Sequence, residues 1–495
     1  MWRLNKVRYK TGQHAESLEE FRLRRREKER ALRQARRDRQ LVSKRLLLNQ
    51  DENEEHDTME ITPGELDVVS LFQKLQQSGT EKEAYIRTLS KALRDPSAQL
   101  IFIKLENSIH LLVSLLTGSD AWCRLQAVRC LHELSHSPHP GVATACLPAT
   151  PYLLTYLSGQ STKFTELCLY TLGNICPESE VVKERLLAQG IIPALGSCIQ
   201  TQRHNLAVVE AAGFTLFQLL QSKDAIQKVI PMVLASSLPS LLLSVLTPDP
   251  EFGLAPAIEC AWCLHSLTSS TEDHSRLLAE GALRHCSSLL VSLGGAVGKE
   301  NVDQEVELLV CPLLRCVGNL LSSCPAEALG SQLRDAQLVA PLCGLLFAFL
   351  NTQPALAREA AWVLNNLTAH STDCCSALLT FHLVPRLIDL LPFSQGINTM
   401  VLRVLANVAH KNKEFCIQLA ELGLLSALTA TLKMADQDMV TLSLEVLFMM
   451  VASSPMIVEQ FVRQGGLSVL EAIQYNSEGE VRRRATFLLE QHILT

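Results

Sequence analysis

"WVLNNL", residues 362–367, is one of eight similar six-residue segments that close apolar helical stretches along this chain. The other seven are RCLHEL (129–134), YTLGNI (170–175), FTLFQL (214–219), WCLHSL (262–267), RCVGNL (315–320), RVLANV (403–408) and EVLFMM (445–450). Their first residues lie 41 to 53 positions apart. Because the apolar residues keep helical spacing in each segment, the pattern predicts stacked helical units of about 40 to 50 residues.

A second series alternates with the first and marks where an apolar helix begins. Its members are Pro151, Pro193, Pro239, Gly281, Pro341, Pro385, Gly423 and Gly466. Gly or Pro at these points permits a sharp turn between a short first helix and a second helix. One unit cannot bury its own apolar faces, so stacked neighbours must share a continuous core. The sequence therefore predicts an all-α solenoid of the armadillo or HEAT type, in which each third helix lines one concave wall.

The charge divides the chain into three predicted parts. Residues 1–49 carry sixteen basic and six acidic residues, although the net charge of the chain is −6. Residues 51–67 hold eight acidic residues and no Lys or Arg. The expected organisation is a basic arm at 1–50, an acidic linker at 51–67 and a solenoid at 68–495, with about eight full units plus a C-terminal partial unit.

The basic arm has few apolar residues and no heptad seam, so it is expected to form a helix only with a partner. Its charge alone also fits a solvated run or a nucleic-acid-binding segment. No aromatic residues interleave its arginines, which argues against stacking on single-stranded nucleic acid.

The arm and the repeats together resemble the importin-α family. Residues 24–45, RRREKERALRQARRDRQLVSKR, are similar to the family's importin-β-binding segment, and PLLRCVGNL (312–320) and residues 465–490 are similar to its fifth and last repeats. The stretches LVSKRLL, CLHELSHS, ACLPATPYLLTYL and LCLYTLGN resemble a divergent branch of that family. The resemblance implies a right-handed superhelical armadillo solenoid with an N-terminal basic helical arm.

It also implies an adaptor for protein import into the nucleus, found in the cytoplasm and nucleus. The arm would bind importin-β through Arg24, Arg25, Arg26, Lys28, Arg30, Arg33, Arg36, Arg37, Arg39, Lys44 and Arg45. The solenoid groove would bind basic nuclear-localisation segments of cargo proteins. The last basic cluster of the arm, which in the family folds back into the groove, is one basic residue short here, so weaker autoinhibition is expected.

The family's groove uses a Trp and an Asn four residues later, which share one face of each third helix. The resemblance assigns this role to Tyr170 with Asn174 and Glu178, Phe214 with Gln218, Trp262, Arg315 with Asn319, Trp362 with Asn366, and Arg403 with Asn407. The first and eighth units depart, with Arg129 and Glu133, and with Glu445 and Met449. An Arg in a slot for a cargo Lys repels it, so ordinary localisation peptides are expected to bind weakly or in a shifted register. Alternatively, these residues are ordinary core and capping residues.

Other chemistry is weakly supported by the sequence. The sixteen cysteines are scattered and no signal peptide is evident, which indicates reduced core thiols in a cytosolic or nuclear protein. CAWC (260–263) has redox or metal spacing but falls inside a predicted helix, and GGAVGKE (294–300) lacks the P-loop residues. No catalytic constellation is found, and neither an enzyme, a cofactor nor a metal is expected.

Two rival hypotheses remain. The chain could be an armadillo scaffold or regulator that has lost general cargo binding. It could also be a membrane protein anchored near LVAPLCGLLFAFL (338–350), although this run is shorter than the roughly 20 residues that a spanning helix needs.

Overall fold

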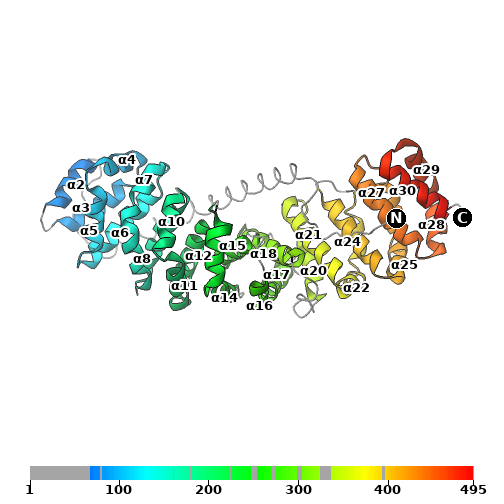
Figure 1. The fold of residues 1–495 in the computed structure, drawn as a ribbon, viewed down its shortest axis with the longest axis horizontal. Coiled ribbons are helices and arrows are strands. Elements are labelled where there is room, and N and C mark those ends of the chain that lie inside the picture. Colours follow the sequence, from blue (N-terminus) through cyan, green and yellow to red (C-terminus); the bar gives the residue numbers. More distant parts are fainter. Residues whose placement is uncertain are drawn as a thin grey trace. The chain divides into compact units, whose positions relative to one another are not determined.

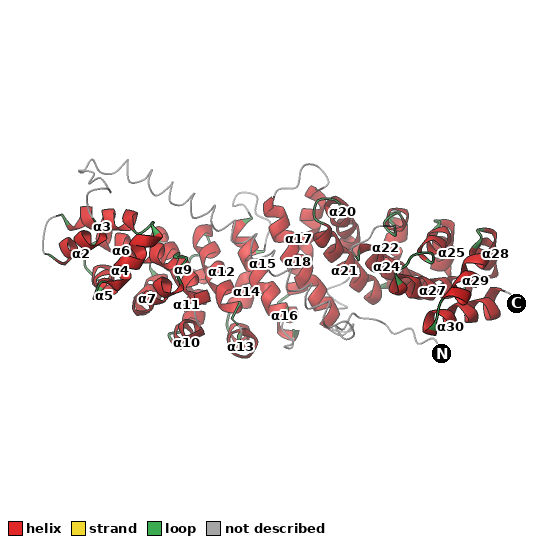
Figure 2. Cartoon of the chain, turned by 90° about the horizontal axis from the view of Figure 1, so that it is seen from above, coloured by secondary structure: helices red, strands yellow, loops and turns green. Residues whose placement is uncertain are grey.

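The computed structural model describes residues 67–77, 81–159, 161–178, 180–222, 224–246, 254–269, 274–297, 304–323, 336–392 and 396–493. Within these ranges every regular element is helical and there is no strand (Figure 2). The chain forms two compact units, an N-terminal unit, Met1–Thr155, and a C-terminal unit, Tyr156–Thr495.

The N-terminal unit consists of short helices around an apolar core. They are α2 (Val68–Gln76), α3 (Lys82–Ala92), α4 (Pro96–Lys104), α5 (Ser108–Leu116), α6 (Ala121–Ser135), α7 (Pro140–Ala145) and α8 (Thr150–Thr155). Asp120 begins α6 as its N-cap, because its carboxylate accepts hydrogen bonds from the backbone N–H groups of Trp122 and Cys123. Helix α6 packs on both α3 and α5, and the segment RCLHEL lies at its C-terminal end.

The C-terminal unit is built around a row of third helices. They are α9 (Thr162–Ile175), α12 (Leu206–Leu220), α15 (Ala255–Thr268), α18 (Gln304–Ser323), α21 (Pro354–His370), α24 (Ile397–Lys411), α27 (Gln437–Val451) and α30 (Gly479–Leu488). Each packs directly against the next, so the row is continuous from α9 to α30 (Figure 1). The seven predicted segments of this unit all lie on these helices, near the C-terminal end of most of them.

The first and second helices of the units cover the row. They are α10 (Glu180–Ala188), α11 (Ile191–Thr201), α13 (Ile230–Ala235), α14 (Leu238–Val245), α16 (Ser275–Ala279), α17 (Ala282–Val297), α20 (Val339–Phe349), α22 (Thr372–Thr380), α23 (Val384–Ile388), α25 (Lys413–Glu421), α26 (Leu424–Thr431), α28 (Pro455–Arg463) and α29 (Gly466–Asn476). The second helices α11, α14, α17, α20, α26 and α29 each pack on the third helix that follows them. Stacked units thus bury faces that no single unit could cover.

The turns between first and second helices use the left-handed backbone region. Gly281 and Gly423 have φ angles of +83° and +93°, as their predicted place in a sharp turn requires. In the last unit Gly466 begins α29, as predicted, and the preceding Gly465 takes the positive φ of +78°. His382 makes the corresponding turn with φ +53°, which is costly for a residue with a Cβ.

The first described helix begins at Val68. The predicted boundaries of the arm and the linker lie outside the described residues. Fifteen of the cysteines lie in the described ranges, and all of these are free thiols; fourteen are buried and Cys311 is half-buried. The prediction of reduced core thiols agrees with this arrangement.

Candidate protein-binding site

The candidate site is the face of the third helices that carries the first and fifth positions of the six-residue segments. First-position residues of the C-terminal unit are Tyr170, Phe214, Trp262, Arg315, Trp362, Arg403 and Glu445. Fifth-position residues are Asn174, Gln218, Ser266, Asn319, Asn366, Asn407 and Met449. Because these two positions are four residues apart, each pair shares one helix face.

A first-position ring packs on the fourth position of the preceding third helix. A Cβ on Gly318 would lie 2.1 Å from the Trp362 ring, and a Cβ on Gly173 would lie 2.5 Å from the Phe214 ring. Real Cβ atoms do not approach carbon so closely, so only glycine allows each ring to lie on the neighbouring backbone. The sequence shows the two GN pairs but gives no sign of which ring covers them.

The slot between the first two aromatic residues is closed. The ring centroids of Tyr170 and Phe214 are 5.3 Å apart, and the rings are tilted by 39°. Two rings that hold an alkyl stem between them need about 7–8 Å, which is two carbon contacts of 3.5–4.0 Å. A cargo Lys or Arg stem therefore does not fit between Tyr170 and Phe214 in this arrangement.

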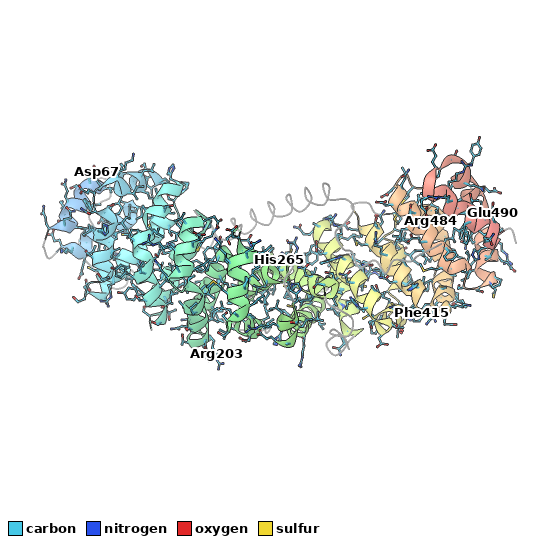
Figure 3. All side chains as sticks on the ribbon, in the orientation of Figure 1. Asp67, Arg203, His265, Phe415, Arg484 and Glu490 are labelled. Atoms are coloured by element: carbon cyan, nitrogen blue, oxygen red, sulfur yellow. The ribbon has the colours of Figure 1, made fainter. Side chains whose placement is uncertain are left out.

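The ring of Trp262 is also enclosed by its own fold. It makes edge-to-face contacts with Phe217 at 6.1 Å and with His265 at 5.7 Å, and only 3% of Trp262 is exposed. Figure 3 labels His265 on the row of helices. Its Nε2 atom lies 3.5 Å from Nη1 of Arg315 on α18, and Arg315 is buried. At this unit the structure favours the alternative that Trp262 is an ordinary core residue over a role in a cargo groove.

The asparagines join neighbouring third helices. Asn366 Nδ2 donates to the backbone oxygen of Gly318 at 3.3 Å, and Asn407 Nδ2 donates to that of Asn365 at 3.0 Å. Asn319 donates to hydroxyl groups at the end of α15. These bonds fix the register between successive helices. Because an amide has two N–H donors and an oxygen that accepts two bonds, each asparagine keeps the chemical capacity for a further polar contact.

Trp362 differs from the other aromatic residues because it is half-buried and lies between helices that carry no other ring at the first position. Arg358, Trp362 and Asn366 follow one another at four-residue spacing along α21, and Arg403, Asn407 and Lys411 do so along α24. The stem of Arg358 lies beside Gly396 at the start of α24. Lys411 Nζ donates to the backbone oxygen of Ala369 near the end of α21. Arg358 and Lys411 therefore each reach across the seam between α21 and α24.

The C-terminal end of the row holds an ion pair that the sequence analysis missed. Glu445, at the first position of α27, pairs with Arg484 of α30, which Figure 3 labels. Arg484 Nε also donates to Glu480 at 2.9 Å. The hydrogen bond and charge of Arg484 lower the pKa of the Glu480 carboxyl. Beside this pair, the rings of Phe448, Phe487 and His492 contact one another. The RRR run at 482–484 was the available signal, but its partner could not be read from sequence.

The first unit shows a different use of its first and fifth positions. Glu133 is buried and its backbone oxygen accepts a hydrogen bond from Gln99 Nε2 at 3.0 Å, while its carboxylate lies 3.7 Å from Arg94. The departure of this unit from the Trp and Asn pattern thus coincides with internal contacts. The side chain of Glu178 and all of the arm residues lie outside the described ranges, so their assigned roles stay predictions.

The CAWC thiols are core residues. Cys260 and Cys263 lie inside α15, as predicted, and both are buried and unbridged. Burial raises the pKa of Cys260 well above its ordinary value, which disfavours the thiolate that metal binding or exchange requires. Among the described residues no group of three or more His, Cys, Asp or Glu could hold a metal ion.

A model of the TMCO6 family matches residues 68–493. The chain belongs to the TMCO6 family. The match spans the predicted solenoid and confirms the resemblance to a divergent branch of the importin-α family.

The relatives of this TMCO6-family chain agree with that assignment. "Importin subunit alpha-9" of Arabidopsis thaliana is 26% identical over 290 residues, which are 58% of this chain and 53% of the relative. The chain thus matches about half the length of this relative. The crystal structure of an engineered protein superposes with a TM-score of 0.65 at 20% identity, covering 87% of this chain and 99% of that one. The fold is an all-α armadillo-like solenoid, as the repeat spacing predicted.

The helix in the 338–350 run is shorter than a spanning helix, as the length of the run had indicated. Helix α20 has 11 residues, which is about 16 Å at 1.5 Å per residue, and a bilayer core is about 30 Å thick. Among the described residues, one helical stretch is long and apolar enough to cross a membrane, Val306–Ser323 within α18. The number of candidate spans rises to three if each of two bent helix pairs is counted as one span. Of that window, 61% is buried inside the fold, because α18 packs against α15, α17 and α21.

Proposed function

We propose that this chain is a protein-binding adaptor of the importin-α type, and that its third helices α18, α21 and α24 bind an extended segment of a partner protein. The family and the armadillo-like fold support a scaffold for protein binding. The observation that carries the proposal is Trp362: its half-buried ring lies on Gly318 with Asn366 one turn further along the same face.

The chemistry of this face suits an extended chain. An indole ring provides a flat wall for an alkyl or aromatic side chain, and an extended segment also presents unpaired backbone N–H and C=O groups. Asn319 and Asn407 lie on either side of α21, and their amide nitrogens already donate within the fold. Their amide oxygens are the atoms that can accept from the N–H groups of such a backbone.

The basic arm is proposed to bind importin-β as a helix. Its 24 residues from 22 to 45 would span about 36 Å, and their net charge of +9 would give fast association and a steep dependence on salt. An acidic inner surface on importin-β is the complementary partner. The corresponding location is the cytoplasm and the nucleus.

A binding titration with importin-β tests this proposal. The full chain and the chain lacking residues 1–50 are compared across a salt series. The proposal expects tight binding that weakens steeply with salt and disappears with the arm. Equal binding by the two chains would contradict it.

A second candidate is an armadillo scaffold or regulator without general cargo binding. Three features favour this scaffold. The slot between Tyr170 and Phe214 is closed, the Trp262 ring is enclosed, and arginines stand at positions 315 and 403. Titration of a basic localisation peptide against the wild-type chain and Trp362→Ala separates the two candidates. Equal affinity for both chains would favour the scaffold.

Membrane attachment is tested by extracting the expressed protein with alkaline carbonate. An adaptor held only by surface contacts is released into the supernatant, whereas a spanning helix stays in the pellet.

A further inference from the structure

We propose that the exposed ring of Phe487 forms a second docking site, on α27 and α30, for a partner segment that carries an aromatic or large aliphatic residue close to a basic one. This site lies on other helices than the site at Trp362, so it does not depend on the proposed function. It follows from a ninth copy of the six-residue segment, FLLEQH at 487–492, beyond the eight predicted ones.

The ninth segment is recognised by its packing. Phe487 comes 42 residues after Glu445, which is within the spacing of the other segments. Its ring contacts Phe448, the fourth-position residue of α27, with 6.0 Å between the ring centroids. Trp362 lies in the same way on the fourth-position Gly318 of the helix before it. Phe487 is therefore the first-position residue of the segment that ends α30.

The Phe487 ring is held away from the backbone of α27. Phe214, which lies on the glycine at position 173, has 6% of its surface exposed, whereas Phe487 has 37% exposed. Phe448 places a ring where Phe214 meets a glycine, so Phe487 packs on that ring instead of on the helix backbone. His492 supports both rings from the side, with centroid distances of 5.4 Å and 6.0 Å. Part of an aromatic surface thus faces solvent at a position that is buried at Phe214.

The surface beside these rings is apolar and its nearby ion pair is satisfied. Met449, the fifth-position residue of α27, is half-buried, and a thioether packs well against aromatic rings. Glu445 pairs with Arg484, which also pairs with Glu480. The other acid of α27, Asp438, lies ten residues before Phe448, or about 15 Å along the helix. The surface therefore suits an uncharged side chain better than a Lys or Arg alone.

Glu490 makes the end of α30 negative. It is exposed, it lies three residues after Phe487 in the π-helical turn Leu489–Ile493, and Figure 3 labels it. Among the described residues it forms no ion pair. The carbonyl groups at the C-terminal end of a helix add a partial negative charge. The exposed cation Arg482 lies eight residues earlier, about 12 Å along the helix, so a cation of a partner is favoured beside Glu490.

These features fit a segment with an apolar anchor and a neighbouring cation. An aromatic or large aliphatic side chain would cover the exposed part of the Phe487 ring and would itself leave water. In an extended segment, residues two apart point to the same side and are about 7 Å apart, so a Lys or Arg next to the anchor reaches Glu490. An acid at that place would be repelled. A segment of Lys and Arg alone has no anchor for the ring.

Fluorescence anisotropy with three short labelled peptides of equal length tests the inference. The first peptide has a central Phe, a Lys two residues to either side of it, and Ser elsewhere. The second has Ser in place of the Phe, and the third has Glu in place of each Lys. Each is titrated into the full-length chain and into Phe487→Ala, Phe487→Met, Glu490→Lys, Trp362→Ala and Phe381→Ala. Phe381→Ala is the matched control, because Phe381, directly after α22, has 51% of its surface exposed.

The first peptide should bind the wild-type chain about tenfold more tightly than either of the others. Phe487→Ala should weaken the first peptide about tenfold, and Phe487→Met should weaken it less because it keeps an apolar surface. Glu490→Lys should reverse the preference, so that the third peptide binds more tightly than the first. Phe381→Ala and Trp362→Ala should leave the affinity for the first peptide unchanged.

Several results would overturn the inference. If the wild-type chain binds the first peptide no better than the second, or if Phe487→Ala does not weaken it, the docking site is wrong. Binding that falls in Trp362→Ala and not in Phe487→Ala would place the peptide at the site of the proposed function and leave that function standing. If Glu490→Lys still prefers the first peptide to the third, the requirement for a basic residue is wrong.

Discussion

Replacing Gly318 by Ala tests whether glycine holds the Trp362 ring in place. The new Cβ would lie 2.1 Å from the ring, and an ordinary carbon contact is about 3.5 Å. The ring or the helix must therefore move by about 1.4 Å. Overpacking of this kind costs about 1–3 kcal/mol, and the better helix propensity of Ala returns about 1 kcal/mol. The expected net loss in the stability of α18 and α21 is up to about 2 kcal/mol.

Gly344→Ala is the matched control for this change. Gly344 lies inside α20, is exposed, and its added Cβ would meet its nearest neighbour, the backbone oxygen of Gly294, at 3.8 Å. Only the propensity gain applies there, so this variant should be more stable by about 1 kcal/mol. The difference between the two variants isolates the clash with the ring.

Hydrogen exchange of the backbone amides measures the effect locally, because each unit of a solenoid contacts only its neighbours. Amides of α18 and α21 should exchange up to about 30-fold faster in Gly318→Ala, while those of α27 should not change. The double variant Gly318→Ala, Trp362→Leu should restore slow exchange in α18. If the backbone amides exchange equally slowly in Gly318→Ala and Gly344→Ala, the Trp362 ring does not lie on Gly318. The proposed register between α18 and α21 would then be wrong.

Three further predictions follow from burial and backbone geometry. Because the Phe214 ring packs within the fold, Phe214→Ala should lower the local stability of α9 and α12 by about 3–5 kcal/mol, measured by hydrogen exchange. The same variant should bind a peptide with unchanged affinity. A tenfold loss of affinity would show that Phe214 belongs to the groove. Burial raises the pKa of the Cys146 thiol to about 12, so little reactive thiolate is present at pH 8. Mass-spectrometric mapping after alkylation at pH 8 should therefore find the half-buried Cys311 modified well before Cys146. Equal rates of modification would contradict the packing. His382→Gly should raise the thermal midpoint, with a gain of about 0.5–1 kcal/mol, because glycine relieves the strain of φ +53°; a lower midpoint would show that the imidazole itself stabilises the turn.

The repeats were predictable because their signal is local. Each six-residue segment has its apolar residues at helical spacing, and eight copies at nearly constant intervals specify a stack of helical units. The turns at Gly281 and Gly423 were predictable for the same reason. Where two glycines adjoin, as at 465 and 466, the sequence could not tell which one takes the positive φ; in the structure it is Gly465, and Gly466 begins α29.

The candidate site was less predictable because its contacts join residues more than forty positions apart. The sequence shows an aromatic residue at the first position of several units and treats them as equivalent. In the structure Phe214 closes on Tyr170 and Trp262 is enclosed by Phe217 and His265, whereas Trp362 has no neighbouring ring at the first position. What distinguishes them is the ring on the preceding helix: Tyr170 contacts Phe214 and Phe217 contacts Trp262, whereas α18 has no ring at the first or fourth position of its segment, beside Trp362.

The pattern of apolar residues was enough to predict that the described chain is helical, that it repeats, and where the third helices lie, because spacing along one helix decides which residues share a face. The charges also showed a strongly basic segment ahead of an acidic body. Which of the similar positions are packed, and which lie at the seam between α21 and α24, depends on how the helices pack in the folded chain. That choice depends on the register between neighbouring helices, which is fixed by contacts such as Asn366 to Gly318 and Asn407 to Asn365 that no local pattern encodes.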